Sequence, residues 1–98
     1  MKQITKNAIE KFLTAETFKV SNTEVEVLPN VTILKLFGNA IAYKYNDPNK
    51  TISITNCGWK SDTTKERLNA LPNVSISQKK GVWYLNGTEW NGNLIDIN

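Results

Sequence analysis

The sequence predicts an α+β fold with a short N-terminal helix, an antiparallel β-meander, a second short helix and C-terminal β-hairpins. Three observations support it. Apolar residues recur at helical spacing near the start of the chain, alternate with polar residues between residues 24 and 55, and are separated by turn dipeptides rich in Gly and Asn. The chain has 98 residues, enough for one domain but not for two, so we expect a single domain over residues 1–98.

The first helix is predicted from four apolar residues, Ala8, Ile9, Phe12 and Leu13, which are separated by charged residues. Their spacing is typical of an amphipathic helix, and we place it over residues 6–15, with Thr5 as its N-cap. The next stretch, residues 18–23, favours neither helix nor strand and ends in a polar turn.

Alternation with period two then predicts a three- or four-stranded meander. The apolar and polar runs cover residues 24–27, 31–37, 40–45 and 51–55. We predict Gly38–Asn39 as a two-residue hairpin turn, because such turns favour Gly and Asn. In the run that follows, alternation places Ile41, Tyr43 and Tyr45 on one face of the sheet.

The second helix is predicted from a capping box formed by Thr63 and Glu66, in which each side chain bonds the backbone amide of the other residue. We place this helix over residues 64–71, where Pro72 stops it. Hairpins follow, with a loop at residues 79–81, turns at residues 86–87 and 91–92, and a last strand at residues 94–97.

Several classes of site chemistry lack the residues they need. The chain has no His, the commonest general base near neutral pH, and a single cysteine, Cys57, so the usual zinc sites cannot form. No glycine-rich nucleotide motif is present. We therefore predict no catalytic residue, no metal and no cofactor, and a protein that is not an enzyme.

The expected location is the cytoplasm. No segment approaches the ~20 apolar residues that a membrane span needs, and residues 1–10 lack the apolar core of a signal peptide. A small chain that cannot form an internal disulfide is more typical of a reducing compartment than of secretion. We expect no membrane partner.

The first candidate binding segment is the start of the second helix. Net charge is +3, and residues 31–80 contain eight basic and three acidic residues, which gives +5. Lys60, Thr64, Lys65 and Arg67 lie where a helix N-terminus would attract phosphate. The alternative is a capped helix with a solvated face, since Glu66 and Asp62 place negative charge at the same end.

The second candidate is the hairpin tip formed by Gln78, Lys79 and Lys80, which Trp83 and Tyr84 follow. Alternation places one of these two aromatic residues outward, where it could stack on a base. A lysine-rich tip is also ordinary surface, so both interpretations stay open. We expect the three tryptophans of the chain to be core residues rather than a ligand cage.

The segments GNAIAYKY and GWKSDTTKERLNALPNVSISQKKGVWYLNG, within residues 31–92, resemble small tailed-phage proteins of unassigned function. This resemblance implies a phage protein that acts in the cytoplasm of a bacterial host cell, and it supplies no site residues. Together with the charge pattern, it leads to a prediction of phosphate contact with nucleic acid or a nucleotide. The alternative is a protein–protein inhibitor of a host factor such as a defence-system component, and a homo-oligomer is compatible with both.

Overall fold

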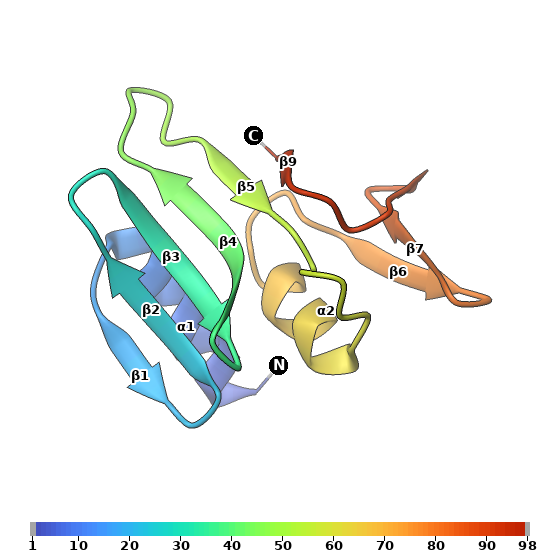
Figure 1. Cartoon of the computed structure of the whole chain (residues 1–98), viewed down its shortest axis with the longest axis horizontal. Helices are drawn as coiled ribbons and strands as arrows, with labels where there is room; N and C mark the ends of the chain where they lie inside the picture. Colours follow the sequence, from blue (N-terminus) through green and yellow to red (C-terminus); the bar gives the residue numbers. More distant parts are fainter. Residues whose placement is uncertain (1, 98) are drawn as a thin grey trace.

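The computed structural model describes residues 2–97 and confirms the α+β class, with antiparallel sheets and two helices in the predicted order (Figure 1). The elements are α1 (Gln3–Thr14), β1 (Phe18–Val20), β2 (Thr23–Val27), β3 (Val31–Leu36), β4 (Asn39–Tyr45), β5 (Ile52–Ile54), α2 (Asp62–Asn69), β6 (Ile76–Lys79), β7 (Val82–Leu85), β8 (Thr88–Glu89) and β9 (Ile95–Asp96).

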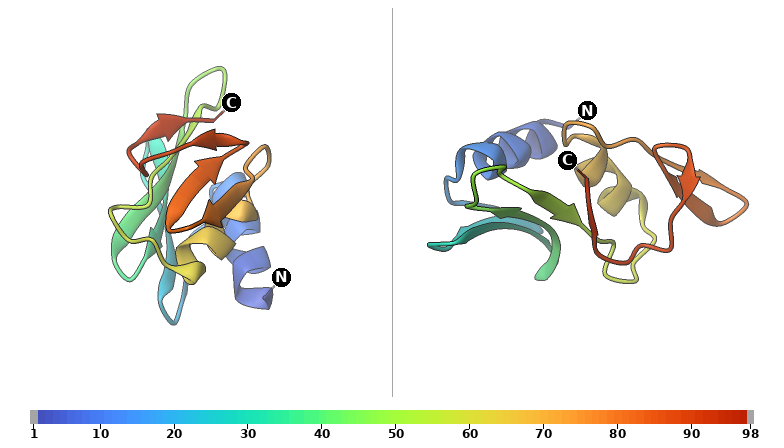
Figure 2. Two further views of the ribbon diagram at one scale, coloured as in Figure 1. Left: turned by 90° about the vertical axis from the view of Figure 1, so that its right-hand side faces the viewer. Right: turned by 90° about the horizontal axis from the view of Figure 1, so that it is seen from above.

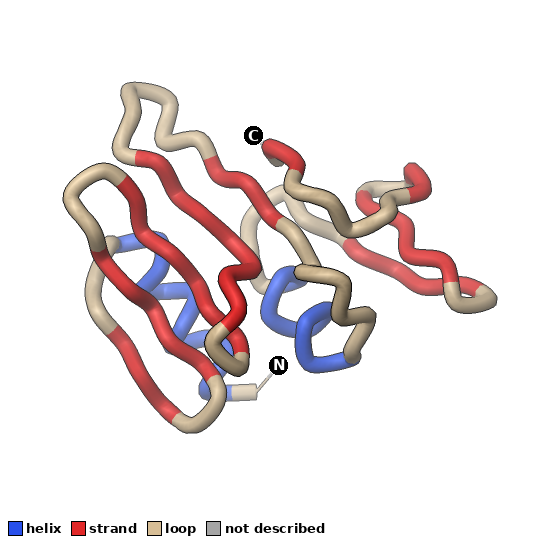
Figure 3. Tube along the Cα trace, viewed as in Figure 1, coloured by secondary structure: helices blue, strands red, loops and turns tan. Residues whose placement is uncertain are grey.

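The strands form two sheets in which every described pairing is antiparallel (Figure 3). The larger sheet has six strands in the order β1-β2-β3-β4-β5-β9, so the meander is extended at both edges. The smaller sheet has three strands in the order β6-β7-β8. The C-terminal segment leaves the small sheet and returns to β5, where Ile54 pairs with Ile95.

Helix α1 covers one face of the large sheet, and within residues 2–97 no helix lies on the other face (Figure 2). Helix α2 sits between the two sheets and packs against α1, β4 and β6. One continuous core results, in which Phe12 of α1, Leu34 of β3 and Trp83 of β7 are each fully buried. Burial of large side chains of this kind contributes about 1.5–3 kcal/mol each.

Helix α1 begins at Gln3, ahead of the predicted start, so Thr5 lies inside the helix and does not cap it. Thr5 is fully buried and donates a hydrogen bond of 2.6 Å to Glu66 Oε1. The helix ends at Thr14, where Ala15 adopts a left-handed conformation with φ 57°. The predicted N-cap was wrong because a threonine can also serve as a buried polar contact between helices.

The prediction that Ile41, Tyr43 and Tyr45 share one face of β4 is wrong, because a β-bulge lies between β3 and β4. Leu34 pairs with Ala42 and Lys35 pairs with Ala40, which leaves Ile41 without a partner in the register. A bulge inserts one residue and reverses the alternation beyond it. Ile41 and Ala42 are therefore both buried, whereas the stacked rings of Tyr43 and Tyr45 stay on the outer face, 6.2 Å apart.

Helix α2 begins at Asp62 and ends at Asn69, a shift of about two residues from the predicted range. Its N-cap is Ser61, whose Oγ accepts a hydrogen bond of 3.1 Å from the amide of Thr64. The predicted capping box is wrong, because Glu66 then lies beyond the first turn, too far along the helix to reach the cap. No helix among the described residues is long and apolar enough to cross a membrane.

Candidate binding surface

The turn between β3 and β4 presents a large aromatic side chain to solvent. Leu36 pairs with Asn39, so the two turn residues are Phe37 and Gly38, one position earlier than predicted. Both have positive φ, 52° and 80°, as a type I′ turn requires. This conformation is unfavourable for a bulky residue. Phe37 nevertheless occupies it, with 71% of its surface exposed and its amide bonded to Asn22 O at 2.8 Å.

The loop between β5 and α2 presents a second exposed aromatic residue, Trp59, which is 63% exposed. Asn56 holds this loop in place. It is 2% exposed, its Oδ1 accepts from the amide of Gly58 at 2.8 Å, and its carbonyl accepts from the amide of Trp59 at 2.8 Å. The amide of Asn56 in turn donates to Gly92 O at 3.1 Å. The backbone that carries Trp59 is therefore anchored to the C-terminal segment.

Gly92 is needed for this anchor, because the side chain of Asn56 lies against it. A Cβ at position 92 would stand 2.2 Å from both Asn56 Nδ2 and Oδ1, and the φ of Gly92 is +87°. Only glycine fits such a close approach in this conformation. Thr55 adds a further bond of 2.7 Å from its Oγ1 to Gly92 O. Gly92 and residues 55–56, which are far apart in sequence, therefore hold the loop that carries Trp59 in one conformation.

Between these two aromatic residues lies a cavity of about 270 Å³, called here the aromatic pocket. Its apolar lining comes from strands β3 and β4 and from the two exposed aromatics: Leu36, Phe37, Ile41 and Trp59. Its polar lining comes from Asn39, Asn56, Ser61 and Thr64. The hydroxyls of Ser61 and Thr64 bond each other at 2.9 Å, so part of the polar lining is already satisfied.

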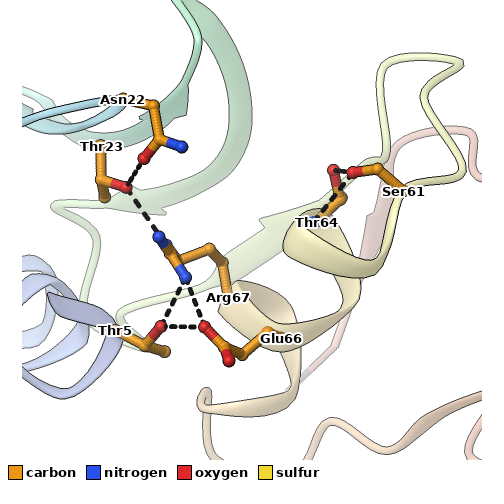
Figure 4. A network of polar contacts seen from close by, with 7 residues as sticks. All are labelled: Thr5, Asn22, Thr23, Ser61, Thr64, Glu66 and Arg67. Atoms are coloured by element: carbon orange, nitrogen blue, oxygen red, sulfur yellow. Dashed lines mark hydrogen bonds and ion pairs between the residues drawn. The ribbon is translucent and has the colours of Figure 1, made fainter. Parts of the chain in front are cut away.

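Three of the candidate binding residues are buried, so the surface role predicted for Arg67 and Thr64 is wrong, and Tyr84 rather than Trp83 is the outward member of the aromatic pair. Arg67 is 3% exposed, Thr64 is 2% exposed and Trp83 is fully buried. The Arg67 guanidinium donates to Thr23 Oγ1 at 3.1 Å, to Thr5 Oγ1 at 2.6 Å and to Glu66 Oε1 at 2.5 Å (Figure 4). It joins α1, β2 and α2, which is a structural role that a basic residue in a helix does not reveal in sequence.

The Arg67 network also lowers the pKa of Glu66. The hydroxyl of Thr5 is the largest cause, followed by the positive charges of Lys2 and Arg67, while burial acts in the opposite direction. Glu66 therefore stays ionised over a wider pH range than a free glutamate. An ionised partner is what a buried guanidinium needs, since an unpaired buried charge is strongly destabilising.

The remaining predicted residues lie on the surface but divide between two faces of the hairpin formed by β6 and β7. Lys65 Nζ bonds Gln78 Oε1 at 2.7 Å, forms an ion pair with Asp62 at 3.2 Å, and lies 5.9 Å from the centre of the Trp83 ring. Alternation along β6 places Lys79 on the opposite face from Gln78, the face that carries Tyr84. Trp83 is inward and half-buried Tyr84 outward, as alternation predicts.

Lys60 connects the loop of Trp59 to the hairpin tip. Its ammonium group lies 3.3 Å from Gly81 O, next to Lys80 in the turn between β6 and β7. Both lysines are exposed. The predicted proximity of the second helix and the hairpin tip is therefore present, because Lys65 bonds Gln78 and Lys60 reaches the turn that contains Lys80.

Cys57 shows no sign of nucleophilic activation. Its thiol donates to Ala40 O at 2.7 Å, and burial raises its pKa, which lowers the thiolate fraction at neutral pH. Among residues 2–97 no group of three or more His, Cys, Asp or Glu side chains could hold a metal ion.

Sequence reasoning missed Phe37 and the exposure of Trp59, which was expected in the core. The available signals were small. Phe37 precedes Gly38 at the predicted hairpin turn, and Trp59 follows Gly58 where the predicted meander ends, so each is a large aromatic residue next to a turn glycine. Of the three tryptophans, Trp83 and Trp90 are buried as predicted, with ring centres 6.1 Å apart.

These features define a small α+β domain with an apolar pocket between two exposed aromatic residues. The chain belongs to the Kyanoviridae Gp96 protein family, whose model matches residues 1–95. It is therefore a phage protein, and the predicted resemblance to phage proteins is confirmed at that level. Neither the curated proteins nor the solved structures contain a match to the chain.

Proposed function

We propose that this phage protein is a non-enzymatic binding protein that acts in the host cell by docking a protein partner at the aromatic pocket. One observation carries the proposal: Phe37 and Trp59, 71% and 63% exposed, flank an apolar cavity on anchored backbone. Tryptophan is enriched among the residues that dominate protein–protein binding energy, and these residues cluster in pockets. A rigid loop also lowers the entropy cost of association.

The few exposed lysines and the two exposed aromatic residues together favour a protein partner over a polyanion. Each phosphate contact contributes about −0.7 to the slope of log affinity against log salt for a single strand. The three exposed lysines Lys60, Lys79 and Lys80 would give a slope of about −2.1, smaller in magnitude than the roughly −3 to −4 expected if all five predicted basic residues contacted phosphates. Loss of one buried aromatic anchor typically costs about 2 kcal/mol or more in a protein interface.

The proposal is tested by co-purification from infected host cells, quantified by mass spectrometry. A tagged wild-type chain is compared with Trp59→Ala and with the matched control Leu94→Ala, which removes a similarly exposed apolar side chain (56%) outside the pocket lining. We expect a stoichiometric protein that Trp59→Ala loses and Leu94→Ala keeps. Equal recovery on all three chains would contradict docking at the pocket.

A second candidate function is phosphate contact with nucleic acid or a nucleotide, favoured by the approach of Lys60 to the hairpin tip that carries Lys80. Gln78, Lys79 and outward-facing Tyr84 would extend this contact along the hairpin. A salt titration with short RNA, single-stranded DNA and nucleotides tests it, with Lys79→Ala/Lys80→Ala as the variant. A slope whose magnitude falls by about 1–1.5 in the variant supports phosphate contact, and absence of binding at low salt excludes it.

A further inference from the structure

The chemistry around the aromatic pocket narrows the kind of partner, if the pocket is the docking site proposed above. Its volume of about 270 Å³ lies just below the range of roughly 300–1,000 Å³ typical of small-molecule sites. A cavity of this size suits one inserted apolar or aromatic side chain. The exposed rings of Phe37 and Trp59 would extend contact to that side chain beyond the cavity itself.

The charged residues on the Trp59 side of the pocket are mostly basic. Near the hairpin tip lie Lys60, Lys65 and Lys80, against the acid Asp62, while Lys79 lies on the other face of the hairpin, so this region carries three positive charges and one negative charge. Asp62 pairs with Lys65, whereas Lys60 donates to the carbonyl of Gly81 in the turn at the tip, which also contains exposed Lys80. The turn between β6 and β7 extends away from the rest of the molecule, at the right of Figure 1.

The opposite side of the pocket is electrically balanced. A shallow depression next to Phe37 is lined by Lys19 and Glu24 together with polar residues, and the two charges offset each other. A segment that lies across the pocket would therefore meet net positive charge at one end only. Complementary charge at an interface raises the association rate and selects against the wrong partners.

We propose that the partner is a protein segment with one large apolar or aromatic side chain, which enters the aromatic pocket, and acidic residues on one side of it, which face Lys60 and Lys80. This inference depends on the proposed function and adds the chemistry of the partner. The apolar anchor supplies affinity, and the acidic residues supply orientation and rate.

The test is selection of a random peptide library on the immobilised wild-type chain, with Trp59→Ala for counter-selection. We expect Trp59-dependent peptides that share an apolar or aromatic residue flanked on one side by Asp or Glu. Trp59-dependent peptides without acidic enrichment would overturn the acidic partner and leave the pocket intact. A lack of Trp59-dependent enrichment would overturn the pocket itself, and with it the proposed function.

A second measurement uses one selected peptide and charge-reversed protein. Lys60→Glu/Lys80→Glu should weaken binding roughly three- to tenfold at low salt, in line with exposed ion pairs, and this difference should shrink as salt screens the charges. Lys6→Glu, an exposed lysine on α1, is the matched control and should change affinity little. If Lys6→Glu weakens peptide binding as much as Lys60→Glu/Lys80→Glu does, the acidic residues of the partner do not face Lys60 and Lys80. A single-stranded oligonucleotide that competes with the peptide would show a polyanion as the occupant instead.

Discussion

Phe37 has a backbone conformation that costs a bulky residue about 1–2 kcal/mol, and its side chain gains little from burial. Strained backbone conformations cluster at functional sites, and among the described non-glycine residues with positive φ Phe37 is the one with an aromatic side chain. A substitution of Phe37 should therefore weaken partner docking without lowering the free energy of unfolding.

We predict that Phe37→Asn stabilises the fold while it weakens docking. The change produces the asparagine–glycine pair that type I′ turns favour, and the free energy of unfolding should rise by about 1 kcal/mol. Urea unfolding measures stability and co-purification measures docking. The control Leu94→Asn introduces the same polar side chain at an exposed apolar position outside the turns. A variant that loses stability and keeps its partner would contradict this interpretation of Phe37.

Trp59 should dominate the solvent-accessible tryptophan fluorescence. It is 63% exposed, whereas Trp83 and Trp90 are 0% and 7% exposed. We expect Trp59→Phe to remove the acrylamide-quenchable fraction and to leave a blue-shifted emission from the buried pair. Trp90→Phe should keep the quenchable fraction. If Trp59→Phe leaves quenching unchanged, the loop does not hold Trp59 in the exposed position described above.

The lowered pKa of Glu66 makes one contribution to stability depend on pH. A carboxylate whose folded pKa lies below its ordinary value of 4.5 stabilises the fold above that value, and the contribution is lost as pH falls through the folded pKa. Since Glu66 is partly exposed, we expect less than about 1 kcal/mol. Urea unfolding at a series of pH values from neutral to below 4.5 should show that the free energy of unfolding falls more steeply for wild type than for Glu66→Gln. Parallel curves would contradict the assignment.

At the scale of elements, the loop between β5 and α2 depends on a glycine in the C-terminal segment. Gly92→Ala adds a strained left-handed residue, about 1–2 kcal/mol, and overpacking against buried Asn56, about 1–3 kcal/mol. Gly87→Ala is a matched control, because Gly87 has the same φ of +87° and no atom within 4 Å of the added Cβ. Denaturant unfolding should show a clearly larger loss at position 92. Equal losses would mean that the Asn56 contact does not constrain the loop.

The sequence predicted the elements where local signals act alone and failed where distant contacts decide. Period-two alternation located β2, β3, β4 and β5, and the glycine turns located the hairpins. The bulge at Ile41 could not be predicted, because it depends on the register between two strands. Ser61, rather than Thr63, caps α2, because Ser61 Oγ accepts from the amide of Thr64 while Glu66 is engaged with Thr5 of α1.

The candidate surface was only partly predictable for a related reason. Charge and aromatic content located the region around α2 and the hairpin tip, and Lys60 does approach that tip. Burial then removed Arg67, Thr64 and Trp83, and the two faces of the hairpin separated Lys79 from Lys65. Phe37 and Trp59 come from loops far apart in sequence, so their shared pocket exists only in three dimensions.

For the whole molecule, the structure suits a small binding protein. Helix α1 and the large sheet form the core, while α2 and the small sheet extend from one end and carry the basic tip (Figure 2). The aromatic pocket lies where these two parts meet, lined by residues of β3, β4 and α2 and by the loop that precedes α2. Binding pockets commonly lie where two packed parts of a protein meet, as the large sheet and α2 do here.

The most direct test of this account is photo-crosslinking in infected host cells. A photoreactive amino acid replaces Trp59 in one chain and Leu94 in a second chain, which serves as the control. The account predicts a discrete adduct from position 59 that protease removes and nuclease does not, with none from position 94. A nuclease-sensitive adduct at position 59, equal adducts at both positions, or none at either would contradict protein docking at the aromatic pocket.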